Sequence, residues 1–181
     1  IAPKDITDHF GVDAFRYYFL RAIPFGTDGS FSWEDMVARY TSELANDFGN
    51  LASRAIAMIE KYCDGHIPDV AQEPELAMAA ALATKTADEK ITALDFQGGI
   101  LAILEFCKSV NGYVTEKAPW VLAKDPANKS ELDRVLYATC ESLRILAVLF
   151  HSVMPETSQK LWSALGGTSL GELSEQRIDD V

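Results

Sequence analysis

The chain has 181 residues, a formal net charge of −11 and 48% hydrophobic residues, and only 24% of its residues are charged. This length and apolar content suit one compact domain, with or without a short appendage, and exclude wholesale disorder. The sequence contains no run of about eighteen uncharged apolar residues, the length needed to span a membrane. Residues 1–9 lack the features of a secretory signal. We therefore expect an acidic cytoplasmic protein and, since the sequence does not begin with Met, a piece of a longer chain.

Cysteine and histidine residues are sparse and scattered. The cysteines Cys63, Cys107 and Cys140 form no Cys-x-x-Cys pair, so they fit buried thiols in a reducing compartment better than a disulfide framework or a zinc site. The sequence has no Glu-x-x-His spacing, glycine-rich phosphate loop or nucleophile elbow. It therefore predicts no catalytic residue, no metal site and no cofactor bound by this chain.

Helical periodicity runs through almost the whole chain, and alternating strand patterns are nearly absent. Apolar residues recur every three or four positions, and turn-forming residues mark the ends of the periodic segments. The predicted helices cover residues 12–22, 33–62, 75–94, 95–116, 130–151 and 155–162. Long amphipathic helices joined by short loops predict an all-α fold, an antiparallel helical bundle.

Local signals refine the ends and faces of these helices. Ser32 with Asp35, and Ser130 with Asp133, each place a hydroxyl three residues before a carboxylate, which predicts an N-cap at the serine. The apolar stripe of the longest helix is Trp33, Val37, Tyr40, Leu44, Phe48, Leu51, Ala55, Met58 and Tyr62. We also expect Gly98-Gly99 to weaken the first turn of its helix by about 1 kcal/mol per glycine relative to alanine.

Asn50 and Arg54 are polar residues that the packing of the longest helix does not explain. On a wheel of about 100° per residue, Asn50 points roughly 130° and Arg54 roughly 90° from the centre of the apolar stripe. The i, i+4 pair therefore lies on one face beside the core. A fixed amide and guanidinium form a hydrogen-bonding surface suited to base edges. An ordinary solvated helix face is the alternative, which periodicity alone favours.

Trp120 follows Ala118-Pro119, where the proline ring ends the preceding helix and restricts the backbone. An indole held at a helix break is a stacking platform for an unpaired base, and such a contact contributes about 1–3 kcal/mol per base. The alternative is a corner tryptophan that folds onto the core. Trp33 and Trp162 lie on apolar stripes and are predicted to pack in the core.

The net charge of −11 argues against binding through phosphate contacts, because proteins that bind RNA in that way are basic. No basic stripe surrounds Arg54 in the sequence. Any RNA contact must therefore be a small patch that uses stacking and base edges, as in the recognition of single-stranded loops.

Six short segments carry a family resemblance. They are FGVDAFRYY at 10–18, IPFGTDG at 23–29, FSWED at 31–35, ELAND at 43–47, GNLASR at 49–54 and EKAPW at 116–120. In this order they resemble the methionyl-tRNA synthetases, a family of class I aminoacyl-tRNA synthetases, over about residues 1–165. The combination is specific, although each segment alone is weak. The family usually has Leu where Phe15 stands, which is a conservative difference.

The resemblance implies a role for each candidate site residue. Asn50 and Arg54 would hydrogen-bond to anticodon bases of a methionine tRNA, Trp120 would stack on one base, and Pro119 would shape the platform. The implied regions are a stem-contact linker over 1–30, an anticodon-binding helical bundle over 31–170 and a polar tail over 171–181.

The ATP-binding signature motifs of the family are missing, as is the strand and helix alternation of a nucleotide-binding fold. The resemblance therefore implies that this chain is inactive alone, and that ATP and Mg²⁺ act in the whole enzyme, a methionine–tRNA ligase. The expected partners are tRNA and the catalytic domain, not DNA or a membrane. Two alternatives stay open: the bundle of another class I synthetase, such as a leucyl or cysteinyl enzyme, and a helical protein-interaction scaffold.

Overall fold

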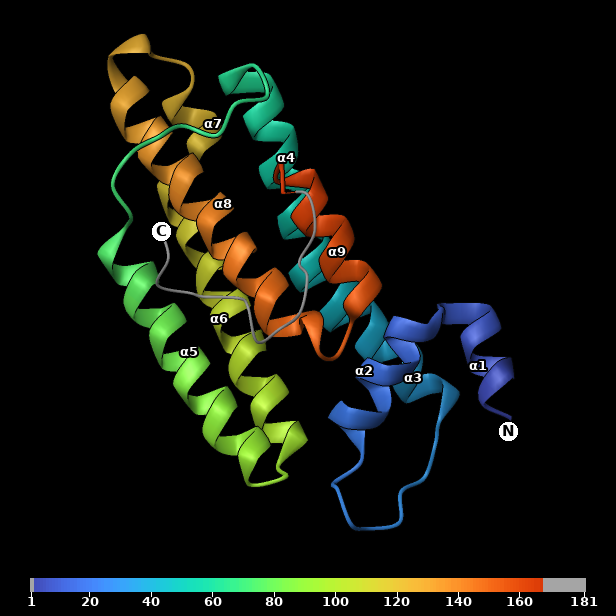
Figure 1. Ribbon diagram of the computed structural model, residues 1–181. Coiled ribbons are helices and arrows are strands. Elements are labelled where there is room, and N and C mark those ends of the chain that lie inside the picture. Colours follow the sequence, from blue (N-terminus) through green and yellow to red (C-terminus); the bar gives the residue numbers. More distant parts are fainter. Residues whose placement is uncertain (1, 168–181) are drawn as a thin grey trace.

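The computed structural model describes residues 2–167, and within this range every regular element is a helix (Figure 1). The predicted all-α fold class is confirmed. No helix in the same range is both long and apolar enough to cross a lipid bilayer. The polar tail predicted for 171–181, and positions 168–170 of the predicted bundle, lie outside the described residues.

The helices follow one another with mostly short connections. Their bounds are α1 Pro3–Phe10, α2 Val12–Ala22, α3 Trp33–Arg39, the π-helical segment η1 Tyr40–Gly49, α4 Asn50–Cys63, α5 Pro74–Thr92, α6 Phe96–Lys117, α7 Pro119–Leu122, the 3₁₀ turn η2 Pro126–Asn128, α8 Lys129–His151 and α9 Pro155–Ala164. Every predicted helix is present, and its ends differ from the prediction by at most a few residues.

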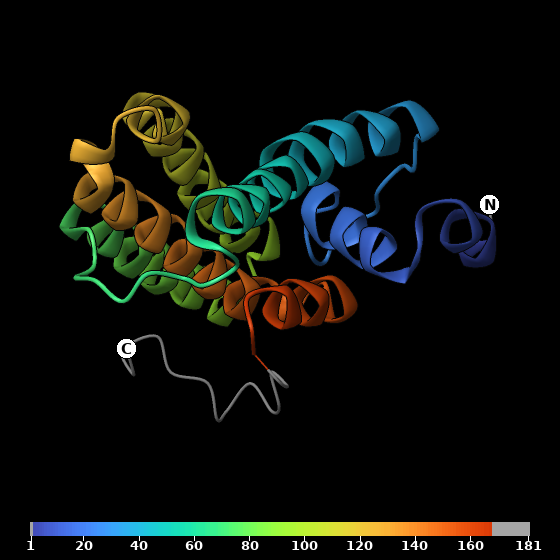
Figure 2. The ribbon, with the colours of Figure 1, turned by 90° about the horizontal axis from the view of Figure 1, so that it is seen from above.

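The bundle consists of α4, α5, α6, α8 and α9, with α8 at its centre (Figures 1 and 2). In Figure 1, α4 and α6 run in one direction and α5 and α8 in the other, which confirms the antiparallel arrangement. Even polar residues of α8 are buried, and the hydroxyls of Thr139 and Ser142 donate to backbone carbonyls one turn earlier at 2.7 and 2.8 Å. The bundle therefore closes around a helix whose buried hydroxyls are satisfied within the helix itself.

Gly99 allows α5 and α6 to approach closely. A Cβ atom added at Gly99 would lie 2.6 Å from Cγ1 of Ile91, so a larger residue would force a shift. The neighbouring Gly98 donates its backbone N–H to Asp95 Oδ1 at 2.9 Å, which caps the first turn of α6. The cap and the close packing offset the intrinsic weakness of this glycine pair.

An aromatic cluster, separate from the bundle core, holds the N-terminal helices together. Its buried members are Ile6, Ala14, Tyr18 and Met36, and the rings that pack against them are Phe10, Phe15, Phe19, Phe31 and Trp33. The rings of Phe31 and Trp33 meet edge to face, with 5.0 Å between their centroids. The segment that precedes the bundle therefore has a core of its own.

The first helix, α1, was not predicted from the sequence. Pro3 occupies its first position, and the Asp5 side chain accepts a hydrogen bond from the backbone N–H of Ala2 at 3.1 Å. Ile6 is its one buried residue, so this short segment has no apolar stripe for periodicity to detect.

The longest predicted helix is continuous, but its middle part, η1, has the i→i+5 bonding of a π-helix. Where this part ends, the N–H of Asn50 donates to the carbonyl of Ala45, five residues back. Wider turns change the angle between successive side chains, so the predicted apolar stripe is wrong at its start. Val37 and Tyr40 are 49% and 38% exposed, whereas Met36 is buried.

The two predicted serine caps have different outcomes. Ser32 caps α3, because its hydroxyl accepts the N–H of Asp35 at 3.2 Å, as predicted. Ser130 is not a cap, since the 3₁₀ turn leads directly into α8 and the helix begins one residue earlier, at Lys129. The side chain of Asp133 instead pairs with Lys129 within the helix.

Two charged side chains of α2 fix the corner between α8 and α9, and we call Asp13 and Arg16 the corner clamp. Asp13 Oδ2 accepts the backbone N–H of Thr157, in the first turn of α9, at 2.6 Å. Arg16 donates from Nε to the Val153 carbonyl at 2.9 Å and from Nη2 to the Ser152 carbonyl at 2.7 Å, just after α8. The carboxylate thus meets the positive end of one helix dipole, and the guanidinium meets the negative end of another.

Replacing Asp13 with alanine should lower the free energy of unfolding by about 1–2 kcal/mol, because the first turn of α9 loses a charged acceptor. Chemical denaturation followed by circular dichroism measures this change. Asp8→Ala is the matched control, since Asp8 pairs with Lys4 on an exposed face of α1, and it should change stability by less than about 0.5 kcal/mol. Equal losses in the two variants would contradict the role of the clamp.

Candidate nucleic-acid interface

Asn50 and Arg54 lie in the first two turns of α4, and both are exposed. The neighbouring Leu51 and Ala55 are fully buried, so the core holds this helix from its other side. The structure places the polar pair beside the core, as the helical wheel predicts.

Arg54 is held by one neutral partner from α6. Its Nη2 donates to Asn111 Oδ1 at 2.8 Å. The Asn111 amide in turn donates to the backbone carbonyl of Asp47 at 2.8 Å and to that of Cys107 at 3.2 Å. No carboxylate within residues 2–167 forms an ion pair with Arg54. The guanidinium therefore keeps its charge and several N–H donors for a ligand.

The backbone carbonyl of Asp47 lies in the π-helical segment, three residues before α4, and it accepts side-chain donors. The donors come from two side chains of α6, Asn111 Nδ2 and the Sγ of Cys107, the latter at 3.4 Å. The irregular segment thus supplies the acceptor that fixes Asn111.

Asn50 has a weaker contact within its own helix. Its Nδ2 lies 3.4 Å from Oδ1 of Asn46, one turn earlier, which is long for a hydrogen bond. The Asn50 amide can therefore turn towards another partner at little cost. Asn46, Asn50 and Arg54 follow one another at i, i+4 spacing on an exposed face, and we call these three residues the polar ridge.

A strained corner at the end of α6 presents Trp120. Ala118 has φ 45° and ψ 62°, the left-handed conformation that favours glycine. Pro119 is buried and is the first residue of α7. The N–H of Val121 closes the turn on the Ala118 carbonyl at 2.7 Å. Trp120 is 42% exposed on this corner, so the alternative of a tryptophan folded into the core is wrong.

The helix α6 sets the separation between this corner and the polar ridge. Asn111, which contacts Arg54, lies six residues before the end of α6 at Lys117. Six residues at about 1.5 Å each give about 9 Å along the helix axis. No hydrogen bond joins Trp120 to Arg54 in the described part of the chain. The residue that contacts Arg54 and the corner that precedes Trp120 are therefore separate points, about 9 Å apart along the axis of α6.

The corner also packs towards α4. Leu122 of α7 lies in the same hydrophobic cluster as Met58 and Tyr62 of α4. In Figure 1, α7 and the last turn of α4 lie at the same end of the bundle. Packing on both α4 and α8 keeps the short helix α7 in a fixed place.

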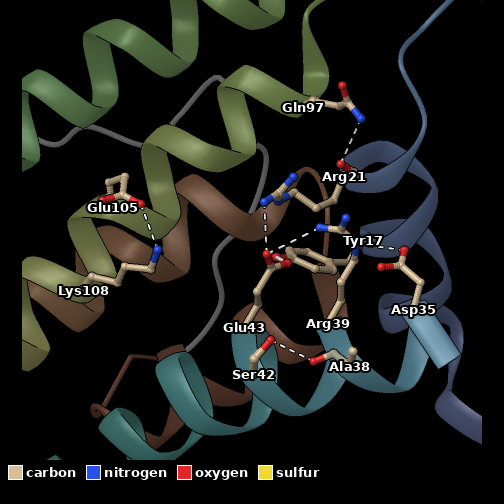
Figure 3. A network of polar contacts seen from close by, with 10 residues as sticks. All are labelled: Tyr17, Arg21, Asp35, Ala38, Arg39, Ser42, Glu43, Gln97, Glu105 and Lys108. Atoms are coloured by element: carbon tan, nitrogen blue, oxygen red, sulfur yellow. Dashed lines mark hydrogen bonds and ion pairs between the residues drawn. The ribbon is translucent and has the colours of Figure 1, made fainter.

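A second polar cluster lies where α2, α3 and η1 meet (Figure 3). Glu43 accepts hydrogen bonds from the Tyr17 hydroxyl at 2.6 Å and from Arg21 Nη2 at 3.0 Å, and Arg39 pairs with it at 3.6 Å. Burial, with the Glu43 carboxylate, raises the pKa of Tyr17 far above its ordinary value, so the hydroxyl stays protonated. The hydrogen bond from Arg39 lowers the pKa of Asp35. These contacts join α2 to the long helix, which gives the cluster a structural role.

Two of the three thiols are buried, and the third is partly exposed. Across residues 2–167, no group of three or more His, Cys, Asp and Glu side chains is placed to hold a metal ion. The cysteines are free. Burial raises the pKa of Cys107 and of Cys140 to about 12, so neither forms a thiolate at neutral pH.

Comparisons with known proteins add an independent line of evidence. The family model described as tRNA synthetases class I (M) matches residues 1–56. The methionine–tRNA ligase of Streptomyces coelicolor is 55% identical over 100% of this chain, and that of Enterococcus faecalis is 44% identical over 92% of it. The chain spans only 35% and 26% of these relatives. The crystal structure of the free methionyl-tRNA synthetase of Mycobacterium tuberculosis matches with a TM-score of 0.92 and 33% identity, over 99% of this chain and 37% of that one.

The chain therefore corresponds to part of a class I tRNA synthetase. The matched family segment ends two residues after Arg54, so it includes Asn50 and Arg54 but not Trp120. More narrowly, the chain corresponds in sequence and in fold to a region of the methionyl-tRNA synthetases, which confirms the resemblance drawn from the sequence. Relatives at 55% and 44% identity that are methionine–tRNA ligases argue against a leucyl or cysteinyl enzyme.

Asn111 is the residue that the sequence analysis missed. It lies inside α6 next to the fully buried Val110, where asparagine is a poor helix former. An asparagine in a helix interior beside a buried position indicates a tertiary hydrogen-bond partner. Periodicity alone gives no hint that this partner is Arg54.

Replacing Ala118 with glycine should raise the free energy of unfolding by about 1 kcal/mol, because glycine adopts the left-handed conformation without the steric cost of a Cβ atom. Thermal and chemical denaturation measure the change. Ala102→Gly, in the regular interior of α6, is the matched control and should instead cost about 1 kcal/mol. Destabilisation by both substitutions would show that the corner is not strained.

Proposed function

We propose that this chain is the tRNA-recognition region of a methionyl-tRNA synthetase, in which the polar ridge and Trp120 bind the anticodon of a methionine tRNA. The proposal rests on an exposed indole at the corner that ends α6 and on an exposed Arg54 held by Asn111, which lies about 9 Å back along the axis of α6. Stacking surfaces and rigid hydrogen-bonding groups are what recognition of unpaired bases requires.

Each site residue has a distinct task in this proposal. Trp120 stacks on one anticodon base, and Pro119 fixes the direction of the platform beneath it. Arg54 donates hydrogen bonds to base edges, and Asn50 both donates and accepts them. An axial separation of about 9 Å corresponds to between two and three base steps of roughly 3.4 Å each. The two contact points can therefore engage different bases of the anticodon.

The excess of acidic over basic residues fits binding through the bases better than binding through the phosphates. A net charge of −11 repels the RNA backbone at long range. Stacking and base-edge hydrogen bonds depend less on that field, because they act at contact distance. Affinity that comes from bases rather than phosphates also makes binding more dependent on the anticodon sequence.

The whole protein, in this proposal, joins methionine to its tRNA in the cytoplasm through a methionyl-adenylate made from ATP with Mg²⁺. The similar Mycobacterium tuberculosis synthetase has been crystallised with bound methionyl-adenylate, which supports this intermediate. The catalytic domain is part of the length that this chain does not span. Residues 1–30 form the stem-contact linker and residues 31–170 the anticodon-binding bundle.

Replacing Trp120 with alanine in the full-length enzyme should lower kcat/KM for tRNA charging by the equivalent of about 1–3 kcal/mol, because one base loses its stacking surface. Methionine-dependent ATP–pyrophosphate exchange, which needs no tRNA, should stay unchanged. Val121→Ala is the matched control, since Val121 is 51% exposed on the same short helix but offers no ring. A large loss of exchange activity in Trp120→Ala would show that the indole is structural instead.

Replacing Arg54 with alanine should reduce discrimination between the methionine anticodon and single-base variants by about 10-fold to 100-fold, because a rigid donor to a base edge is lost. The ratio of kcat/KM values for the two tRNAs measures discrimination. Lys61→Ala removes the same charge from the same helix and should leave the ratio unchanged. Unaltered discrimination by Arg54→Ala would count against the proposed function.

A further inference from the structure

We propose that Asn111 is a positioning residue for anticodon recognition, which holds the Arg54 guanidinium ready for a base without neutralising its charge. The inference rests on the proposed function of the polar ridge. Asn111 lies on α6, is only partly exposed, and acts through Arg54 rather than by touching RNA.

The contacts of Asn111 allow only one orientation of its amide. The NH₂ group donates to the carbonyls of Asp47 and Cys107 at 2.8 and 3.2 Å. A flipped amide would point its own oxygen at two carbonyl oxygens, which repel it. Oδ1 must therefore face α4, where it accepts the bond from Arg54 Nη2 at 2.8 Å. Asn111 is thus an acceptor whose place and direction are both fixed.

The anchors of Asn111 are rigid because they belong to packed helices. Cys107 is fully buried, and Phe48, which follows Asp47, is 4% exposed. Both residues belong to the main hydrophobic core. One Asn111 amide therefore links α6 to the start of α4 and transmits the rigidity of the core to an exposed side chain.

Fixing Arg54 in the free protein favours binding. A free arginine side chain samples many rotamers, and a ligand that selects one of them binds more weakly for that reason. The bond to Asn111 restricts the guanidinium before the ligand arrives. Rigid placement of a donor also sharpens discrimination between bases, since a mobile guanidinium can adapt to the wrong base.

The neutrality of Asn111 matters as much as its position. A carboxylate there would form a charge-assisted pair with Arg54 and would compete with RNA for the guanidinium. The amide directs Arg54 and leaves its charge for the ligand, in a chain whose net charge is −11. The contact is therefore suited to presenting a cation rather than to burying an ion pair.

Steady-state charging by the full-length enzyme tests the inference with four proteins: wild type, Arg54→Ala, Asn111→Ala and the double variant. Asn111→Ala should raise KM for the methionine tRNA about tenfold, the effect of one hydrogen bond to a charged group, with little change in kcat. It should also reduce discrimination against anticodon variants. In the Arg54→Ala background the same substitution should have almost no further effect, because its target is gone. A purely structural residue would lower kcat and add its loss to that of Arg54→Ala.

Asn111→Asp keeps the size and the acceptor of the side chain and serves as a second variant. It should also raise KM for tRNA, because its carboxylate competes for Arg54 and because it can no longer donate to the Asp47 and Cys107 carbonyls. Ser109→Ala is the matched control on α6, since the Ser109 hydroxyl bonds only to the Glu105 carbonyl of its own helix, and it should behave as wild type. ATP–pyrophosphate exchange should be unchanged in every variant.

The outcomes separate this inference from the function on which it rests. If Arg54→Ala discriminates as well as wild type, the proposed function fails. If Arg54→Ala is defective but the losses of the two single variants add in the double variant, the positioning role of Asn111 is overturned and the proposed function stands. A wild-type KM in Asn111→Asp would overturn the claim that the acceptor must be neutral.

Discussion

Opposite charges at two helix ends hold the two parts of this molecule together. Asp13 and Arg16 lie on one side of α2, where the carboxylate meets the start of α9 and the guanidinium meets the end of α8. The same helix reaches the long helix through Tyr17 and Arg21, which both donate to Glu43. Asn50 and Arg54 on α4, and the end of α6 that precedes Trp120, belong to the bundle that α2 holds against the N-terminal aromatic cluster.

The π-helical segment η1 has two effects that share one cause. Wider turns rotate the side chains before α4, so Met36 rather than Val37 faces the core. Near the end of this segment, the Asp47 carbonyl accepts hydrogen bonds from two side chains of α6. An irregularity in one helix thereby sets both the packing of the N-terminal part and the contact between α4 and α6 that holds Arg54.

Much of this architecture could be predicted from the sequence, and the failures have physical reasons. Periodicity located the bundle helices because each buries a long apolar stripe. It did not detect α1, because that helix buries only one residue. Sequence spacing cannot distinguish i→i+4 from i→i+5 bonding, so the predicted stripe failed at Val37 and Tyr40, before and at the start of η1. The exposure of Asn50 and Arg54 was predictable because both follow η1, on a regular stretch. The role of Asn111 could not be predicted, because it depends on a contact between α4 and α6, which are far apart in the sequence.

One helix, α6, carries Asn111, which contacts Arg54, and ends at the corner that precedes Trp120. The axial offset between Asn111, which contacts Arg54, and the end of α6 is therefore set by the backbone rise of one helix. Under the proposed function, a tilt of the N-terminal part against the bundle would leave this offset unchanged, because both points belong to α6.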